Sequence, residues 1–156
     1  MGGELARVET ALRTSVVSED PHLTELASHL IQAGGKRLRP ALSVAVAACL
    51  TGLPVTEDVV LGGVSVELVQ VGSLYHDDVM DEATTRRGVE SVNARFGNLK
   101  AILSGDFLLA QASALAASLG GADKMGVTPF KSGRKRMLMY HSSSTEKGCT
   151  PRVISW

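Results

Sequence analysis

The chain has few of the residues that build cysteine-based sites. Its 156 residues include two cysteines, Cys49 and Cys149, which lie far apart and make no metal-binding spacing. Cys49 stands among alanine and leucine residues, so we expect it to be a small residue of the core. The pattern therefore gives no support to a zinc site or another cysteine-ligated metal centre.

Membrane and secretion signals are also missing from the sequence. No apolar run reaches the length of about 20 residues that a transmembrane helix needs. No apolar signal-peptide core opens the chain. We therefore expect a cytoplasmic protein without an integral membrane span.

The sequence also lacks the alternation of apolar and polar residues that indicates strands, so we predict an all-α fold. Apolar residues spaced three and four apart predict five helices, at about residues 4–17, 21–33, 40–50, 57–80 and 100–119. Thr56 is a candidate N-cap for the fourth helix. That helix contains Gly62, Gly63 and Gly72, each of which costs up to about 1 kcal/mol relative to alanine. We expect close helix packing or a ligand to explain them.

The net charge of zero hides an uneven distribution along the chain. Residues 1–120 carry nine Lys or Arg against fourteen Asp or Glu, and residues 121–156 carry seven against two. The regular apolar pattern ends near the same point. We predict a helical domain over residues 1–120 and a basic, poorly ordered tail over residues 121–156. A membrane- or RNA-binding tail is the alternative, but interleaved aromatic residues and an amphipathic pattern are missing, so we expect no nucleic-acid partner.

The most informative segment runs from His76 to Gly88, with the sequence HDDVMDEATTRRG. If it is helical, Asp77 and Asp81 share one face and Asp78 lies at its edge. Carboxylates at this spacing repel each other by a few tenths of a kcal/mol, so a compensating charge is expected. Mg²⁺ held by one or two carboxylates and substrate phosphates would supply it. Two arginines follow, whose guanidinium groups match phosphate oxygens. The alternative is a solvated acidic helix end and a basic loop.

A second basic element, GGKRLRP, occupies residues 34–40. Its two glycines let the backbone approach a ligand closely. Pro40 suits the first helical position and disfavours helical geometry at Arg39. The cations of Lys36, Arg37 and Arg39 would then lie at a helix start, which favours anions. It lacks the P-loop pattern, and a surface loop of solvated cations is the alternative.

These segments together resemble the trans-polyprenyl diphosphate synthases. The resemblance rests on GGKRLRP, on ELV at residues 67–69 followed by SLYHDDVMD at 73–81, on RRG at 86–88 and on GDFLLA at 105–110, in the family's order. It covers about residues 1–119. It implies half of an isoprenoid-synthase helical bundle, Mg²⁺ as cofactor, and condensation of an allylic diphosphate with isopentenyl diphosphate to give a longer polyprenyl diphosphate.

The resemblance also implies residue roles. Asp77 and Asp81, with Asp78 beside them, would hold Mg²⁺ ions that bridge to the allylic diphosphate, which Arg86 would also contact. Isopentenyl diphosphate would be bound by the following residues: Lys36, Arg39, Gln70 and Arg87. Many relatives have histidine where this chain has Gln70, and glutamine can donate a hydrogen bond to phosphate but carries no charge. A polar helix–helix contact is the alternative role of Gln70.

Five further residues near these motifs have other assignments. For His76 we favour packing, or support of the carboxylates, over a role as general base. Asp106 stands in an apolar helix and is interpreted as structural, with a partner if buried. Gly72 and Ser73 lie about one turn before Asp77, where small residues favour a product longer than farnesyl, although Phe107 could close that space.

The sequence lacks one part of the family's pattern. After Asp106 the only acidic residues are Asp123 and Glu146, so the second aspartate-rich motif is absent. We therefore expect a truncated or frame-shifted chain of this lineage with impaired activity. Alternatives are a non-catalytic partner that packs against a full-length synthase, or a terpene cyclase, which GGKRLRP disfavours. A homodimer or pairing with a full-length synthase is expected.

Overall fold

The computed structural model describes residues 2–120 and shows the predicted all-α architecture. Six helices follow one another: α1 (Gly2–Ser15), α2 (Pro21–Gln32), α3 (Leu38–Thr51), α4 (Glu57–Met80), α5 (Val92–Phe96) and α6 (Asn98–Leu119). Between α4 and α5 lies a short hairpin of β1 (Thr85–Arg86) and β2 (Val89–Glu90). The predicted tail, residues 121–156, lies outside the described residues.

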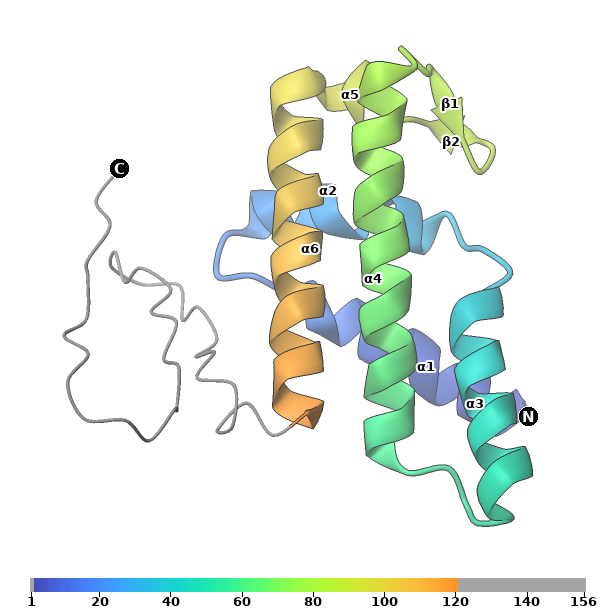
Figure 1. Cartoon of the computed structure of the whole chain (residues 1–156). Helices are drawn as coiled ribbons and strands as arrows, with labels where there is room; N and C mark the ends of the chain where they lie inside the picture. Colours follow the sequence, from blue (N-terminus) through green and yellow to red (C-terminus); the bar gives the residue numbers. More distant parts are fainter. Residues whose placement is uncertain (1, 121–156) are drawn as a thin grey trace, which may run out of the picture.

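The two longest helices, α4 and α6, stand side by side and form the centre of the bundle (Figure 1). Helix α3 lies along the other side of α4, and α1 and α2 cross behind (Figure 1). The hairpin and α5 gather at the end of α4 where its carboxylates lie (Figure 1). The core comprises fully buried side chains from α1, α2, α4 and α6, among them Leu12, Leu30, Leu68, Tyr75 and Leu108.

Helix boundaries follow local signals. Asp20 caps α2 by accepting a hydrogen bond from the His22 amide. Thr56 occupies the N-cap position of α4, as predicted, but its side chain makes no capping hydrogen bond. Helix α3 begins at Leu38, so Arg39 is helical and Pro40 is its third residue. The expectation that Pro40 would displace Arg39 from the helix was wrong, because proline disfavours helical geometry before it without forbidding it.

Two of the glycines in α4 mark close contacts between helices. A Cβ at Gly72 would lie 3.0 Å from the Gly105 carbonyl oxygen of α6, and a Cβ at Gly63 would lie 3.0 Å from Pro40 Cα of α3. The close packing expected of these glycines is therefore confirmed. Gly72 faces the backbone of α6, so it does not border open space for a growing chain as the sequence suggested.

By length and composition, α4 and α6 could each cross a membrane, a test that buried core helices also meet. The most apolar 18-residue stretch of α4 is 50% buried in the described bundle, and that of α6 is 22% buried. The expectation about apolar run length therefore does not hold for these helices. The absence of a membrane span stays a prediction.

Candidate functional site

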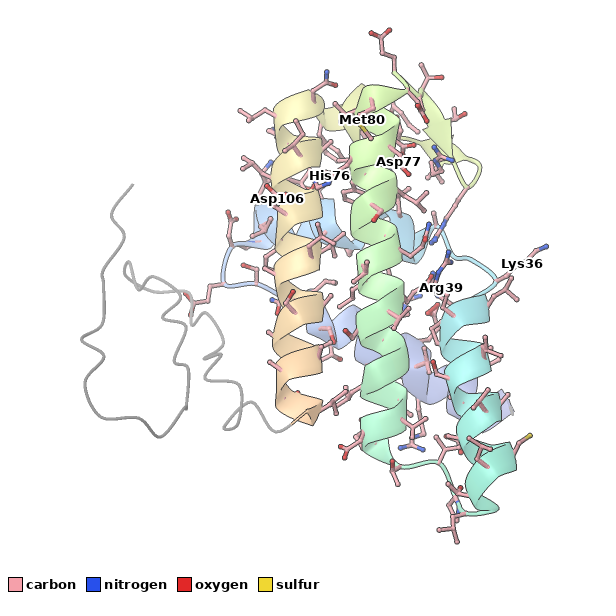
Figure 2. All side chains as sticks on the ribbon, in the orientation of Figure 1. Lys36, Arg39, His76, Asp77, Met80 and Asp106 are labelled. Atoms are coloured by element: carbon pink, nitrogen blue, oxygen red, sulfur yellow. The ribbon has the colours of Figure 1, made fainter. Side chains whose placement is uncertain are left out.

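The carboxylates at the end of α4 separate into two faces. Asp77 lies in the last turn of α4 and Asp81 is its C-cap residue, still in helical conformation, so the two are one turn apart. Neither side chain forms a hydrogen bond or ion pair with the described residues. Asp77 points toward the hairpin side of α4 (Figure 2). This pair is the accessible acidic element of the site.

Asp78 differs from its neighbours because its side chain is only 1% exposed. Its Oδ1 accepts a hydrogen bond from Arg86 Nε at 2.7 Å and forms an ion pair with Arg86 Nη2 at 2.5 Å. The backbone around it is held by Asn93, whose Nδ2 donates to the carbonyls of Asp78 and Ala83. Among residues 2–120, Asp78 Oδ2 is buried without a hydrogen-bond partner. The structure therefore makes Asp78 the anchor of Arg86 and separates it from the pair of Asp77 and Asp81.

Arg86 extends from β1 over the acidic end of α4. Its ion pair with Asp78, and then the charges of Asp81 and Asp77, raise the pKa of Arg86. The guanidinium thus stays charged beside the two free carboxylates, with the side chain about a third exposed. Such a group can contact an anion that approaches a metal held by Asp77 and Asp81.

The residues present fit a Mg²⁺ ion that is completed by a ligand. No group of three or more His, Cys, Asp or Glu side chains in residues 2–120 could hold a metal ion by itself. Two free carboxylates one turn apart are nevertheless the donor set that Mg²⁺ uses when substrate phosphates complete its coordination.

The basic residues of the segment 34–40, like the aspartates, comprise exposed side chains and a buried one. Lys36 and Arg39 are exposed, and neither side chain has a hydrogen-bond or ion-pair partner among residues 2–120. Lys36 extends away from the bundle and Arg39 lies toward α4 (Figure 2). Arg37, between them, is buried and pairs with Glu9 and Glu67. Lys36 and Arg39 thus keep their charge available at the start of α3, whereas Arg37 does not join the predicted anion site.

Arg87 reaches from the hairpin to the glycine loop, and Gln70 lies on α4. Arg87 Nη1 donates to the carbonyl oxygens of Leu30 at 2.9 Å and Gly34 at 2.6 Å, so this arginine reaches the glycine loop. Its side chain is 19% exposed. Gln70 is half-buried on α4, seven residues before Asp77 and therefore on the same face. The structure thus joins Arg87 to the glycine loop and places Gln70 on the face of α4 that carries Asp77.

His76 and Asp106 form a contact between helices. His76 Nε2 lies 3.3 Å from Asp106 Oδ1 and 3.3 Å from the Ile102 carbonyl oxygen, both in α6. Figure 2 shows both side chains on the α4–α6 side, away from Lys36 and Arg39. Packing, one of the two roles favoured for His76, is confirmed, and Asp106 is an exposed partner.

Comparison with known proteins assigns the family. A family model described as polyprenyl synthetase matches residues 20–145. The chain belongs to this family. A nonaprenyl diphosphate synthase from Mycobacterium tuberculosis is 46% identical over 116 residues, which cover 74% of this chain and 34% of that protein. Heptaprenyl diphosphate synthase component 2 from Geobacillus stearothermophilus is 40% identical over 120 residues, covering 77% and 37%.

Comparison with solved structures agrees with the comparison of sequences. A polyprenyl synthase from Caulobacter crescentus, solved in complex with calcium and isoprenyl diphosphate, matches with a TM-score of 0.68 and 35% identity. The match covers 75% of this chain and 35% of that one. The resemblance and the isoprenoid-synthase fold inferred from the sequence are therefore confirmed. The chain spans about a third of the length of these relatives.

Sequence reasoning missed several features of this family member. The segment between the helices predicted at about residues 57–80 and 100–119 contains the hairpin, whose turn places Arg87 and Gly88 at φ +53° and +78°. This turn is a two-residue arginine–glycine connection, and both φ values suit a tight hairpin. Cys49, expected in the core, is exposed. The pairing of Glu9 and of the buried Glu67 with Arg37 had no local signal, because Arg37 lies 28 and 30 residues away from them in the chain.

Proposed function

We propose that the chain is a trans-prenyltransferase that condenses an allylic diphosphate with isopentenyl diphosphate and uses Mg²⁺. The observation that carries the proposal is the pair of free carboxylates, Asp77 and Asp81, beside the fixed guanidinium of Arg86. Relatives that are prenyl diphosphate synthases by name support it. In this reaction the allylic carbon–oxygen bond breaks and releases inorganic diphosphate. A carbon–carbon bond forms to the isopentenyl double bond, and a proton is lost.

Each residue of the acidic end would have a definite task. Asp77 and Asp81 would hold Mg²⁺, and Asp78 would act through Arg86, which it orients. When bound, Mg²⁺ supplies positive charge that stabilises the departing diphosphate. Arg86 would contact the same diphosphate with its charged guanidinium. The calcium and isoprenyl diphosphate of the Caulobacter crescentus complex support a divalent metal at such a site.

The basic elements would hold isopentenyl diphosphate. Lys36 and Arg39 offer unpaired charges at the start of α3, where free backbone N–H groups also favour an anion. Gln70 would donate a hydrogen bond to this diphosphate. Arg87 would contribute the part of its guanidinium that Leu30 and Gly34 leave free.

The second candidate function is that of a non-catalytic partner of a full-length synthase. One observation favours it: apolar side chains are exposed along α3. Leu38, Leu42, Val46 and Leu50 recur every four residues and are between 46% and 81% exposed. Such a stripe favours contact with another protein surface. A homodimer, or pairing with a full-length synthase, and a cytoplasmic location are part of this proposal.

A prenyl-transfer assay on the whole chain separates the two functions. The chain is incubated with Mg²⁺, labelled isopentenyl diphosphate, and dimethylallyl, geranyl or farnesyl diphosphate. If the chain is an enzyme, we expect labelled product from the wild type and none from Asp77→Ala. Asp58→Asn should keep the activity, because Asp58 is an exposed residue at the opposite end of α4. If product forms only after a full-length synthase is added, and faster than with that synthase alone, the chain is instead a non-catalytic partner.

A further inference from the structure

Helix α4 carries a second set of carboxylates that faces inward. Glu67 and Asp78 are eleven residues apart, about three helical turns, and therefore lie on the same face. Their side chains are 4% and 1% exposed. Each one contacts an arginine of the Arg86-Arg87 pair: Asp78 contacts Arg86 and Glu67 contacts Arg87. The inner face of α4 thus anchors the arginine pair, whereas the outer face presents Asp77 and Asp81.

Glu67 differs from Asp78 because it contacts a second segment as well. Its Oε1 lies 3.3 Å from Arg37 Nη1 and 3.7 Å from Arg87 Nη2. Arg37 belongs to the glycine loop before α3, and Arg87 belongs to the turn between β1 and β2. One buried carboxylate oxygen therefore joins the two basic elements of the site.

Both arginines of this cluster have strained backbone conformations. Arg37 and Arg87 adopt left-handed backbone conformations, with φ of +46° and +53°, which are unfavourable for residues with a side chain. Their guanidinium groups flank Gly35, where an added Cβ would lie 3.0 Å from Arg37 Nη1 and 3.1 Å from Arg87 Nη1. An anion shared between two cations this close offsets their repulsion, and the Glu67 carboxylate contacts both of them.

The electrostatics of Arg87 agree with this arrangement. Burial, and then the Arg37 charge, lower the pKa of Arg87, and the Glu67 charge opposes that change. The second carboxylate of the cluster, Glu9 in α1, contacts Arg37 through both of its oxygens, at 3.0 and 3.1 Å. Glu9 has no contact with Arg87 within the described residues, so Glu67 alone of the two bridges the segments.

We propose that Glu67 is a positioning residue that couples the glycine loop to the β1–β2 turn and so fixes Lys36 and Arg39 relative to Arg86 and Arg87. Glu67 compensates the charges of Arg37 and Arg87 inside the cluster. Lys36 and Arg39 are then the cations of the loop without a partner among residues 2–120. The proposal rests on the proposed function for its consequence, which is the affinity for a diphosphate. Its structural part is independent of any ligand.

Hydrogen exchange tests the structural part on the whole chain. Backbone amide exchange is measured for residues 33–39 and 85–90 in the wild type, Glu67→Gln and Glu9→Gln. Glu67→Gln is expected to speed exchange about tenfold in both segments, whereas Glu9→Gln speeds it in residues 33–39 alone. Unchanged exchange at residues 85–90 in Glu67→Gln would overturn the coupling. If Glu67→Gln does not fold, Glu67→Asp, which keeps the charge on a shorter side chain, replaces it with the same expectation.

Affinity for isopentenyl diphosphate, measured by calorimetry, tests the consequence. Glu67→Gln is expected to weaken binding about tenfold. Tyr75→Phe is the matched control, because it removes a buried hydroxyl that joins α4 to α2 without touching the arginines. Unchanged affinity in Glu67→Gln, or an equal loss in Tyr75→Phe, would overturn the positioning role. If the wild type does not bind, the proposed function fails, and the exchange result alone decides the coupling.

Discussion

The adjacent residues Asp77 and Asp78 allow a sharp test, because the same chemical change should lower the free energy of unfolding at Asp78 and leave it nearly unchanged at Asp77. Asp78→Asn removes the charge that accepts a hydrogen bond from Arg86 Nε and pairs with Nη2, and it leaves the guanidinium without its buried counter-charge. Losing one partner of a fully buried ion pair costs about 3–5 kcal/mol. Arg86 is 32% exposed and keeps part of its hydration, so we expect a loss of about 2 kcal/mol.

Asp77→Asn is the matched control. The Asp77 side chain has no partner in the described structure, and its removal relieves repulsion with Asp81. We expect a change within about 0.5 kcal/mol in the free energy of unfolding. In urea unfolding followed by circular dichroism, Asp78→Asn should lower the midpoint by about 1 M, since small proteins lose about 2 kcal/mol per molar urea. Equal midpoints for the two variants would refute the assignment of Asp78 as the anchor of Arg86.

Two further predictions follow from the buried contacts of α4. Gly72→Val should lower the free energy of unfolding by about 1–3 kcal/mol, because the new side chain meets the Gly105 carbonyl and Leu109; Ser73→Val, at the half-buried neighbour, should cost less in the same urea assay. A stable Gly72→Val variant would contradict the close-packing role. Burial raises the pKa of Tyr75, whereas an unfolded tyrosine ionises near pH 10. The native state therefore keeps a proton that the unfolded state loses, so stability should fall by about 1.4 kcal/mol per pH unit above about pH 10. Comparing unfolding midpoints with pH for the wild type and Tyr75→Phe checks this, and identical slopes would contradict it.

The helices could be predicted because their signals are local. The periodicity of apolar residues gave the extent of α4 correctly and placed the start of α3 two residues late. The short hairpin was missed, since two-residue strands are too brief to show alternation. Its existence depends on a turn at Arg87 and Gly88 with positive φ at both residues.

The candidate site could be predicted only in part. Residue type and spacing identified Asp77, Asp81, Lys36 and Arg39, and the structure leaves all four without an internal partner among residues 2–120. Their roles as ligands stay predictions. Each of these residues is polar and lies close in sequence to the other charged residues of its motif, so the motif alone was enough to identify it as a candidate site residue.

The inner charges could not be predicted in the same way. Asp78 belongs to the same motif as Asp77, but which of the two turns inward depends on Arg86 and on the packing of α4. Arg37 likewise depends on Glu9 and Glu67, from other helices. Contacts between distant segments decide which charge of a cluster is buried, and they leave no local pattern. The exposure of Cys49 has the same cause, because an apolar neighbourhood in sequence does not show which helix face is covered.

If Asp77 and Asp81 form the proposed metal-assisted diphosphate site, the chain should bind inorganic diphosphate in a Mg²⁺-dependent way. The affinity of the whole chain is measured by calorimetry with and without Mg²⁺, and again in the double variant Asp77→Asn with Asp81→Asn. We expect binding that requires Mg²⁺ and is lost in the double variant, with unfolding midpoints close to that of the wild type. Diphosphate binding that is independent of Mg²⁺, or that survives removal of both carboxylates, would contradict the account.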